Sequence, residues 1–169
     1  MKIGNREFKE AGHTYIMGIL NVTPDSFSDG GKFNQMDAAL KHAEEMIRDG
    51  ADILDIGGES TRPGYTKISD EEEISRVVPV IEAVKKEFDI PVSVDTYKSG
   101  VAEAAAKAGA DLINDIWGLK YDERMAKVIA ESGLACCLMH NRDKAEYENF
   151  MEDMKNDLRE TVALAKAAG

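Results

Sequence analysis

Residues 17–31 read Met-Gly-Ile-Leu-Asn-Val-Thr-Pro-Asp-Ser-Phe-Ser-Asp-Gly-Gly, and they pass abruptly from an apolar run to polar and turn-forming residues. The apolar part, Ile16 to Leu20, has the length of a strand and the near-continuous hydrophobicity of a strand that is buried on both faces. Asn21 follows it directly, and hydroxyl and carboxylate oxygens crowd the positions after it. A strand therefore ends here, and the loop that begins is suited either to hold a metal ion or a phosphate or to be an ordinary solvated turn.

The composition fits one globular domain with an acidic surface. The chain has 169 residues, of which 43% are hydrophobic, and its 32 acidic and 21 basic residues give a formal net charge of -11. This charge repels nucleic acids and anionic membranes. No apolar stretch approaches the ~20 residues that span a bilayer, and the first seven residues lack the hydrophobic region of a signal peptide. We therefore expect a cytoplasmic protein that binds neither nucleic acid nor membranes.

A short apolar run, a polar loop and a helix recur five times along the chain, after a lead-in over residues 1–14 that is a short hairpin or irregular. The expected strands are 16–20, 51–58, 90–96, 111–118 and 134–139. The expected helices are 36–49, 69–88, 98–107, 122–131 and 144–168. Ser69 is the expected N-cap of the second helix, and Pro79 is expected to kink this helix or to separate its first turns.

Five strands that alternate with five helices predict a parallel sheet with right-handed crossovers. An open doubly wound sheet and a (β/α)8 barrel both begin in this way, but the chain has neither a Gly-x-Gly-x-x-Gly motif nor a P-loop. A barrel is favoured because it gathers the carboxyl ends of all its strands at one mouth. The chemically capable residues at those ends are Asn21, Glu59 to Arg62, Asp95, Asn114, Asp115 and His140. We expect an α/β fold of the TIM barrel type, one domain over residues 1–169, with five of the eight βα units in residues 15–169.

Some of these polar residues also have an ordinary structural explanation. Asp95 is suited to cap the following helix, and Asn114 with Asp115 is suited to form an Asx turn. Asp55 lies within a strand, so it is either a paired core carboxylate or a group that points into the barrel, and structural support is favoured. His140 without partners is more often a structural residue than a ligand.

The remaining notable side chains predict packing. Trp117, the single tryptophan, is more often a core residue than a ligand contact. Cys136 and Cys137 are neighbours in an apolar run, so their side chains point to opposite faces of a strand. We expect buried, reduced thiols there in preference to a disulfide or a metal pair.

Residues 17–31 and Asp55-Ile-Gly-Gly-Glu-Ser-Thr-Arg-Pro-Gly64 together resemble the two signature segments of dihydropteroate synthase. Residues 94–98, 113–115 and 138–140 are similar to the third, fourth and fifth strand ends of that family, and the motifs occur in the family's order. The resemblance runs through essentially the whole chain. It implies a barrel of the pterin-binding type and a transferase of folate biosynthesis, which condenses 6-hydroxymethyl-7,8-dihydropterin diphosphate with p-aminobenzoate to give 7,8-dihydropteroate and pyrophosphate.

The resemblance implies that Asp95 and Asn114 bind the pterin, with apolar contacts from Ile116 and Met139. A pterin edge presents adjacent hydrogen-bond donors and acceptors. A carboxylate accepts from the ring N–H and amino groups, and an amide both donates and accepts, so the pair is a selective match.

The resemblance also places Thr61 at the diphosphate, with Arg62 and Pro63 in a mobile loop near p-aminobenzoate. Asn21 corresponds to the position that meets Mg²⁺ and pyrophosphate. One amide oxygen suffices for this role because Mg²⁺ keeps several waters and binds substrate phosphates.

In the implied chemistry, pyrophosphate leaves first and the arylamine then attacks a resonance-stabilised pterin cation. Asp25 and Asp29 of the first loop are expected to stabilise that cation by charge, and Phe27 is expected to close over the aminobenzoate ring.

The chain also departs from the family. A full barrel takes about 250 residues, and the family's sixth-strand aspartate, seventh-strand lysine and serine, and eighth-strand arginine and histidine have no counterpart here. We expect a fragment of a longer synthase that is inactive alone, completed by a C-terminal segment, in preference to a half-barrel that pairs as a homodimer. Two other functions stay open: a pterin-binding methyltetrahydrofolate:corrinoid methyltransferase, which shares the use of Asp95 and Asn114 but does not need the first loop, and a non-catalytic truncated pterin-binding module.

Overall fold

The structure is a computed structural model that describes residues 1–9, 12–23, 32–60 and 66–169. Within these residues the strands are β1 (Lys2–Ile3), β2 (Arg6–Glu7), β3 (Met17–Asn21), β4 (Ile53–Gly57), β5 (Val92–Asp95), β6 (Leu112–Asp115) and β7 (Ala135–Leu138). The helices are α1 (Lys32–Arg48), α2 (Asp70–Glu87), α3 (Ser99–Ala108), α4 (Met125–Ser132) and α5 (Phe150–Ala168).

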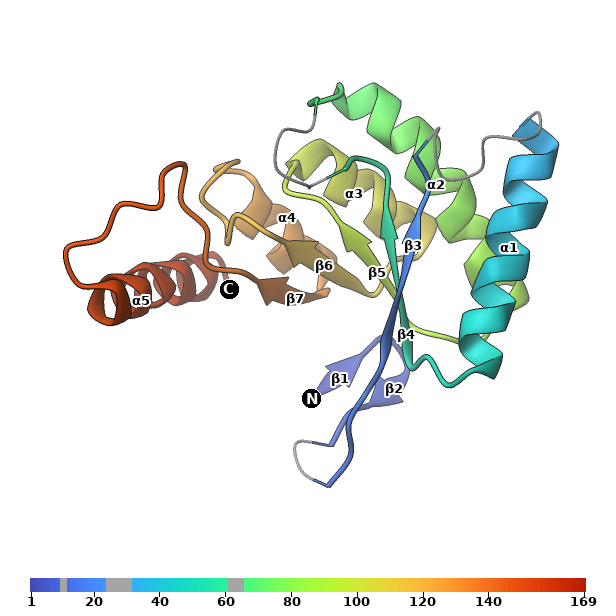
Figure 1. The fold of residues 1–169 in the computed structure, drawn as a ribbon, viewed down its shortest axis with the longest axis horizontal. Coiled ribbons are helices and arrows are strands. Elements are labelled where there is room, and N and C mark those ends of the chain that lie inside the picture. Colours follow the sequence, from blue (N-terminus) through green and yellow to red (C-terminus); the bar gives the residue numbers. More distant parts are fainter. Residues whose placement is uncertain (10–11, 24–31, 61–65) are drawn as a thin grey trace.

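Strands β3 to β7 form one parallel sheet in the order of the sequence, β3-β4-β5-β6-β7. A doubly wound sheet reverses its strand order at a switch point, whereas consecutive order is that of a barrel wall. The barrel-type α/β fold predicted from the sequence is therefore confirmed, with five βα units present. The short strands β1 and β2 form an antiparallel hairpin below the sheet, which is one of the two forms expected for the lead-in (Figure 1).

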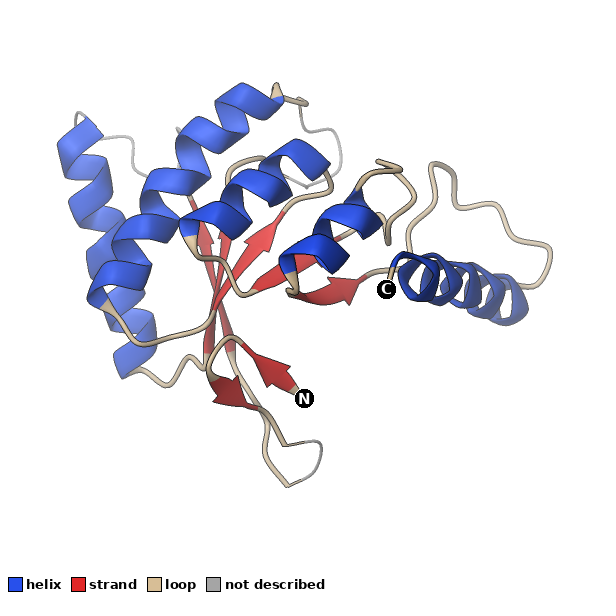
Figure 2. Ribbon diagram, turned by 180° about the vertical axis from the view of Figure 1, so that it is seen from behind, coloured by secondary structure: helices blue, strands red, loops and turns tan. Residues whose placement is uncertain are grey.

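The helices cover one face of the sheet, as Figures 1 and 2 show from opposite sides. Side chains alternate between the faces of a strand, and the row that points toward the helices is fully buried in the main core. This row consists of Leu20, Ile56, Val94 and Ile113, which are partners in the strand register.

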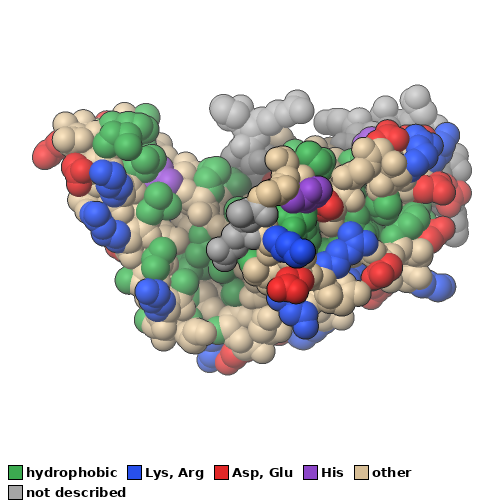
Figure 3. Space-filling view, turned by 90° about the horizontal axis from the view of Figure 1, so that it is seen from below, with side chains coloured by type: hydrophobic (Ala, Val, Ile, Leu, Met, Phe, Trp, Pro, Cys, Tyr) green, Lys and Arg blue, Asp and Glu red, His purple; other side chains and the backbone are tan. Residues whose placement is uncertain are grey.

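The opposite face of the sheet is divided into an apolar lower part and a polar upper part. The hairpin covers the lower part, where Ile3 and Phe8 pack against Ile53 and Leu112. Above them, toward the carboxyl ends of the strands, this face carries polar side chains, which are described below. We call the polar upper part the open face. In Figure 3, from below, hydrophobic side chains are also visible at the surface between the charged groups.

The predicted burial of the first strand on both faces is wrong. Ile19 is 62% exposed and Met17 is 37% exposed, although Leu20 is fully buried. The reason is that β3 is an edge strand with β4 as its neighbour, and only its helix side is covered.

The predicted burial of Cys136 and Cys137 is also wrong, because β7 is the other edge strand of the sheet. Both thiols are free, as expected, but both residues are exposed. Partial burial raises the pKa of each thiol, and the neighbouring thiol adds to the rise for Cys136.

We therefore expect iodoacetamide to alkylate both cysteines in the native protein, more slowly than a free thiol at neutral pH and faster as the pH rises, because the thiolate is the nucleophile. Mass spectrometry of wild type and of Cys137→Ser, which leaves one thiol, measures the two rates. Full protection of both thiols without denaturant would contradict the exposed arrangement.

Three helix starts differ from the prediction, those of α1, α4 and α5, and α1 begins at Lys32 rather than at residue 36. Helix α2 agrees with its predicted bounds and with its predicted N-cap, since the Ser69 hydroxyl accepts from the N–H of Glu72 (3.2 Å), but it continues through Pro79 and its first turns are not separated there. Helix α4 begins three residues late, at Met125, and before it the Asp122 carboxylate accepts from the N–H of Arg124 (2.9 Å) and from the N–H of Ser99 at the start of α3 (2.9 Å). Helix α5 begins at Phe150, where Asn149 provides the cap, rather than at residue 144. In the described part of the chain, no helix combines the length and the apolar character that crossing a membrane requires.

Candidate functional site

Asn21, Gly57, Asp95 and Asn114 lie in one row at the carboxyl ends of four neighbouring strands. The register pairs Asn21 with Gly57, Gly57 with Asp95, and Asp95 with Asn114. Gly57 leaves room between its neighbours, because an added Cβ would lie 3.3 Å from Asn21 Oδ1 and 3.7 Å from Asp95 Cβ. We call Asn21, Asp95 and Asn114 the mouth row. The predicted gathering of these side chains at one edge of the sheet is confirmed.

Asp55 and Ser93 lie one level below the mouth row and are register partners. Asp55 is 5% exposed, and its Oδ2 accepts a hydrogen bond from Asn114 Nδ2 (3.1 Å). Asp55 therefore points to the open face, which is one of the two alternatives predicted for it, and it accepts there from the amide of Asn114. Within the described residues, Asp55 Oδ1, Ser93 Oγ and Asp95 Oδ1 are buried without a hydrogen-bond partner.

The electrostatics of this face favour a ligand that carries N–H donors or positive charge. Burial raises the pKa of Asp95 to about 7, and the negative charges of Asp55 and Glu73 add to the rise. Burial also raises the pKa of Asp55, against the opposing effects of the Ser93 hydroxyl and the Asn114 amide. A donor or a cation that approaches the two carboxyls favours their ionised forms.

Ile116 and Met139 lie next to the ends of β6 and β7. Ile116 is the first residue of the turn after β6 and is half-buried. Met139 follows β7 and is 46% exposed, and its backbone N–H donates to the carbonyl of Asp115 (3.0 Å). Six further predicted site residues lie outside the described residues: Asp25, Phe27, Asp29, Thr61, Arg62 and Pro63.

Asp115 and His140 have structural roles, as one alternative predicted for each. Asp115 is 1% exposed, and its carboxylate accepts from the N–H groups of Trp117 (2.8 Å) and Leu119 (2.7 Å), so it shapes the loop after β6. His140 Nε2 lies 2.8 Å from Asp157 Oδ2 on α5, and this contact ties the end of β7 to that helix.

The sequence did not reveal a buried ionic cluster beside the site, formed by Lys98, Glu59 and Glu73. Lys98 Nζ donates to Glu59 Oε2 (2.9 Å), to Glu73 Oε2 (2.7 Å) and to the carbonyl of Ile68 (2.8 Å). Glu59 also accepts from the N–H of Ile68 (2.7 Å) and from the hydroxyl of Tyr97. Glu59, predicted as a mouth residue, thus uses its carboxylate to connect the loop after β4 with the start of α3.

The described residues contain no group of three or more His, Cys, Asp or Glu side chains that is suited to hold a metal ion. Asn21 is exposed at the end of β3, and its amide oxygen is directed toward Gly57. A single amide oxygen fits Mg²⁺ that is held mainly by water and phosphate oxygens.

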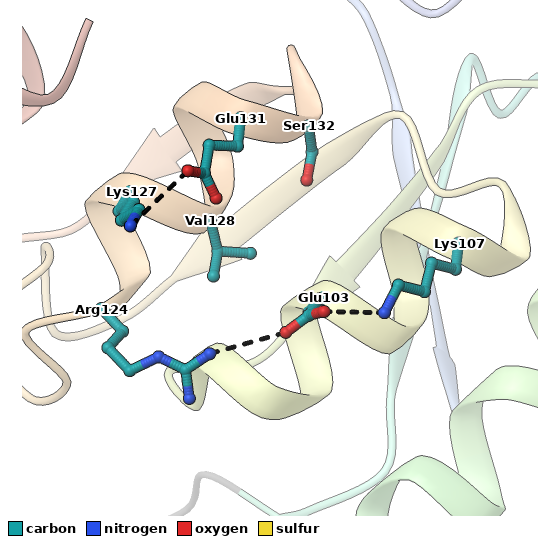
Figure 4. A pocket seen from close by; sticks show the side chains of 7 residues that line it. All are labelled: Glu103, Lys107, Arg124, Lys127, Val128, Glu131 and Ser132. Atoms are coloured by element: carbon teal, nitrogen blue, oxygen red, sulfur yellow. Dashed lines mark hydrogen bonds and ion pairs between the residues drawn. The ribbon is translucent and has the colours of Figure 1, made fainter.

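A separate surface pocket lies between α3 and α4, on the helix side of the sheet (Figure 4). Its charged side chains are paired with one another, Lys107 and Arg124 with Glu103, and Lys127 with Glu131. No residue of the mouth row lines it, so it is not part of the candidate site.

Comparison with known proteins agrees with this geometry. The family described as "pterin binding enzyme" matches residues 17–169. A dihydropteroate synthase from Clostridium beijerinckii is 67% identical over 169 residues, which cover all of this chain and 63% of the relative.

Two solved structures are similar in fold. The dihydropteroate synthase from Clostridium difficile, crystallised in the presence of pteroic acid, has a TM-score of 0.90 and 49% identity, with 100% of this chain and 62% of that chain covered. The enzyme from Xanthomonas albilineans with 4-aminobenzoic acid has a TM-score of 0.85 and 44% identity, with 92% and 57% covered.

The chain spans 63% of the length of the Clostridium beijerinckii relative and 62% of the length of the Clostridium difficile structure. The match to the family extends from β3 to the end of α5, so it includes every residue of the mouth row. This chain belongs to the pterin-binding enzyme family.

Proposed function

We propose that this chain supplies the pterin-binding part of a dihydropteroate synthase, which joins 6-hydroxymethyl-7,8-dihydropterin diphosphate to p-aminobenzoate and releases pyrophosphate. The mouth row carries the proposal, because it sets a carboxyl and two amides side by side above a buried acidic floor. The 67% identity to a dihydropteroate synthase supports the reaction class. Strands β3 and β7 are the sheet edges in the described chain, and further strands of the same barrel on these edges would complete the mouth.

In this proposal Asp95 and Asn114 bind the edge of the pterin ring. Asp95 has a pKa of about 7 and an unpartnered Oδ1, so it is ready to ionise when ligand N–H groups approach. The amide of Asn114 donates a hydrogen bond to an acceptor of the ligand and accepts one from a donor of the ligand. Ile116 and Met139, at the ends of β6 and β7, supply apolar contacts to the ring.

The diphosphate would lie toward Asn21, at the β3 end of the mouth row. Mg²⁺ held by the Asn21 amide oxygen, water and phosphate oxygens would neutralise the leaving pyrophosphate. The resemblance to the family assigns Thr61 to the diphosphate and Arg62 and Pro63 to the aminobenzoate side.

The chemical step is a substitution at the methylene carbon between the pterin and the diphosphate. As the carbon–oxygen bond to pyrophosphate breaks, positive charge develops on the pterin. In this proposal the carboxyls of Asp55 and Asp95, whose pKa values burial raises, stabilise this charge in a setting of low dielectric constant. Asp25 and Asp29 add charge from the first loop, and Phe27 covers the aminobenzoate ring.

Calorimetric titration of the chain tests this proposal without requiring turnover. We expect pterin diphosphate to bind, Mg²⁺ to tighten its binding, and Asp95→Ala or Asn114→Ala to weaken it at least tenfold, since each removes a hydrogen bond to the ligand. Glu103→Ala, an exposed carboxylate on α3, is the matched control and should leave the affinity unchanged.

The two alternatives predict different titrations. A methyltetrahydrofolate:corrinoid methyltransferase would bind methyltetrahydrofolate as tightly as pterin diphosphate and would not respond to Mg²⁺. A non-catalytic module would bind the pterin without any effect of Mg²⁺ or p-aminobenzoate. Absence of pterin binding to the folded chain would reject all three functions.

A further inference from the structure

The side chain of Asn114 reaches across β5 to Asp55 on β4. The register places Asn114 beside Asp95 and Asp55 beside Ser93, so the amide extends over one strand and down by one level. Its Nδ2 donates to Asp55 Oδ2 at 3.1 Å. One of the two Nδ2 hydrogens is therefore committed to Asp55, and the other hydrogen and Oδ1 remain for a ligand.

We propose that Asp55 is a positioning residue that fixes the Asn114 amide in one of its two orientations and thereby sets the order of donor and acceptor that the mouth row presents. An ionised carboxylate only accepts hydrogen bonds, so it selects the orientation with Nδ2 toward Asp55. With the amide turned by 180°, the ligand would meet the donor and the acceptor in exchanged places. The inference rests on the proposed function for the identity of the ligand, which offers a pterin-like edge of adjacent donors and acceptors.

The setting of Asp55 indicates that it is retained for this role rather than for stability. Asp55 is 5% exposed, and none of the ion pairs formed by the described residues includes it. Its Oδ1 has no hydrogen-bond partner in the described part of the chain, and the nearby Ser93 hydroxyl, which lowers the pKa of Asp55, carries no charge. A buried carboxyl without a cation destabilises a fold. A purely structural residue at this position would be expected to have a cation or a complete set of donors.

Nuclear magnetic resonance on the full chain tests the positioning directly. In wild type, we expect the Asn114 side-chain NH₂ protons to exchange slowly with solvent. In Asp55→Ala, their exchange should be at least tenfold faster, while the backbone amides of Asp95 and Asn114 in the sheet keep their rates. Asp49→Asn is the control for the loss of one negative charge, because Asp49 is an exposed residue at the end of α1. This variant should change neither the exchange of the Asn114 NH₂ protons nor that of the backbone amides.

Ligand selectivity is the second measurement. Wild type should prefer 6-hydroxymethylpterin over the isomer with its 2-amino and 4-oxo groups exchanged. We expect Asp55→Ala and Asp55→Asn to reduce that preference at least fivefold. Alanine offers no partner and asparagine offers both a donor and an acceptor, so either orientation of the Asn114 amide is then allowed. Urea unfolding of both variants should give a midpoint equal to or above that of wild type.

The outcomes separate this inference from the proposed function. Unchanged exchange of the Asn114 NH₂ protons in Asp55→Ala overturns the positioning role, whatever the ligand is. A lower unfolding midpoint in both variants, with selectivity unchanged, assigns Asp55 to structural support and also overturns it. Faster NH₂ exchange without any pterin binding by wild type supports the positioning role and rejects the proposed function.

Discussion

Replacing Asp95 by asparagine is expected to stabilise the folded chain above pH 7 and, at the same time, to remove most of its affinity for pterin. Asparagine keeps the shape of the side chain but has no charge to bury. Asp95 Oδ1 is buried without a partner in the described residues, and its neighbours include the carboxyls of Asp55 and Glu73. The ionised Asp95 carboxylate therefore destabilises the folded chain when no ligand is bound. A ligand that donates hydrogen bonds to this carboxylate removes that destabilisation.

The pH range of this effect follows from the pKa of Asp95, which burial, followed by the nearby negative charges, raises from 3.8 to about 7. The folded state holds the proton more tightly than the unfolded state. The contribution of Asp95 to stability is thus fully present below pH 3.8 and is lost as the pH rises through about 7. At about 1.4 kcal/mol for each pKa unit, the cost above pH 7 is on the order of 2–4 kcal/mol.

Urea unfolding of wild type and Asp95→Asn from pH 4 to pH 8 measures the difference. We expect almost equal stability near pH 4 and an advantage of about 2 kcal/mol for the variant at pH 8. Calorimetry should show at least tenfold weaker pterin binding, since a hydrogen bond to a charged group contributes about 1.5–3 kcal/mol.

Asp115→Asn is the matched control, because Asp115 is also buried and its pKa is also raised by burial, but it accepts two backbone hydrogen bonds. It should be less stable than wild type throughout this pH range. An Asp95→Asn variant that is less stable than wild type at pH 8 would refute the explanation.

Much of the fold was predictable because local patterns and backbone chemistry agree. Gly109 and Gly133 directly follow α3 and α4, and their φ values of 103° and 66° are ones that glycine adopts without strain. The consecutive strand order was favoured by the polar residues at every strand end. Local side-chain hydrogen bonds were less predictable, since the Asp122 carboxylate accepts from the N–H of Arg124 just before α4, and Asn149 caps α5 by accepting from the N–H of Glu152.

Exposure was predicted poorly at the two edge strands. The hydrophobicity of Ile19 and Cys137 expresses a preference for burial, but it does not reveal how many neighbours a strand has. Both residues lie on the sheet face without helices, in β3 and β7, and both are exposed. The same hydrophobicity gave a correct prediction for Leu20, because its side chain points to the helices.

The site was predictable where each residue acts from its own strand end, and unpredictable where distant residues combine. Asn21, Asp95 and Asn114 follow from counting along the strands. The hydrogen bond from Asn114 to Asp55 depends on a register across three strands, which one sequence does not define. In the cluster, Lys98 contacts Glu73 and Glu59, which lie 25 and 39 positions before it in the sequence. In the sequence each of the three resembles an ordinary charged residue of a helix or a loop.

Replacing Lys98 by methionine is expected to destabilise the chain by about 3–5 kcal/mol at pH 8, because it leaves two buried carboxylates without their cation. Lys98, Glu59 and Glu73 are each at most 5% exposed. The substitution also removes the hydrogen bond that Lys98 Nζ donates to the carbonyl of Ile68, at the end of the loop that follows β4. The penalty should shrink toward pH 4.5, where the carboxylates can take up protons.

Removing the charges of the carboxylates as well separates the ionic effect from packing. We expect Glu59→Gln and Glu73→Gln, added to Lys98→Met, to recover at least half of the lost stability, because neutral amides are less costly to bury than unpaired charges. Lys107→Met is the control, since Lys107 forms an exposed pair with Glu103 at 2.7 Å and should contribute under about 0.5 kcal/mol. Urea unfolding of the four proteins at pH 8 and pH 4.5 gives these differences. A loss of less than about 1 kcal/mol of unfolding free energy for Lys98→Met alone at pH 8 would contradict the prediction that the two carboxylates depend on Lys98. The loop after β4 would then be held by its other contacts, such as the hydrogen bond from the N–H of Ile68 to Glu59.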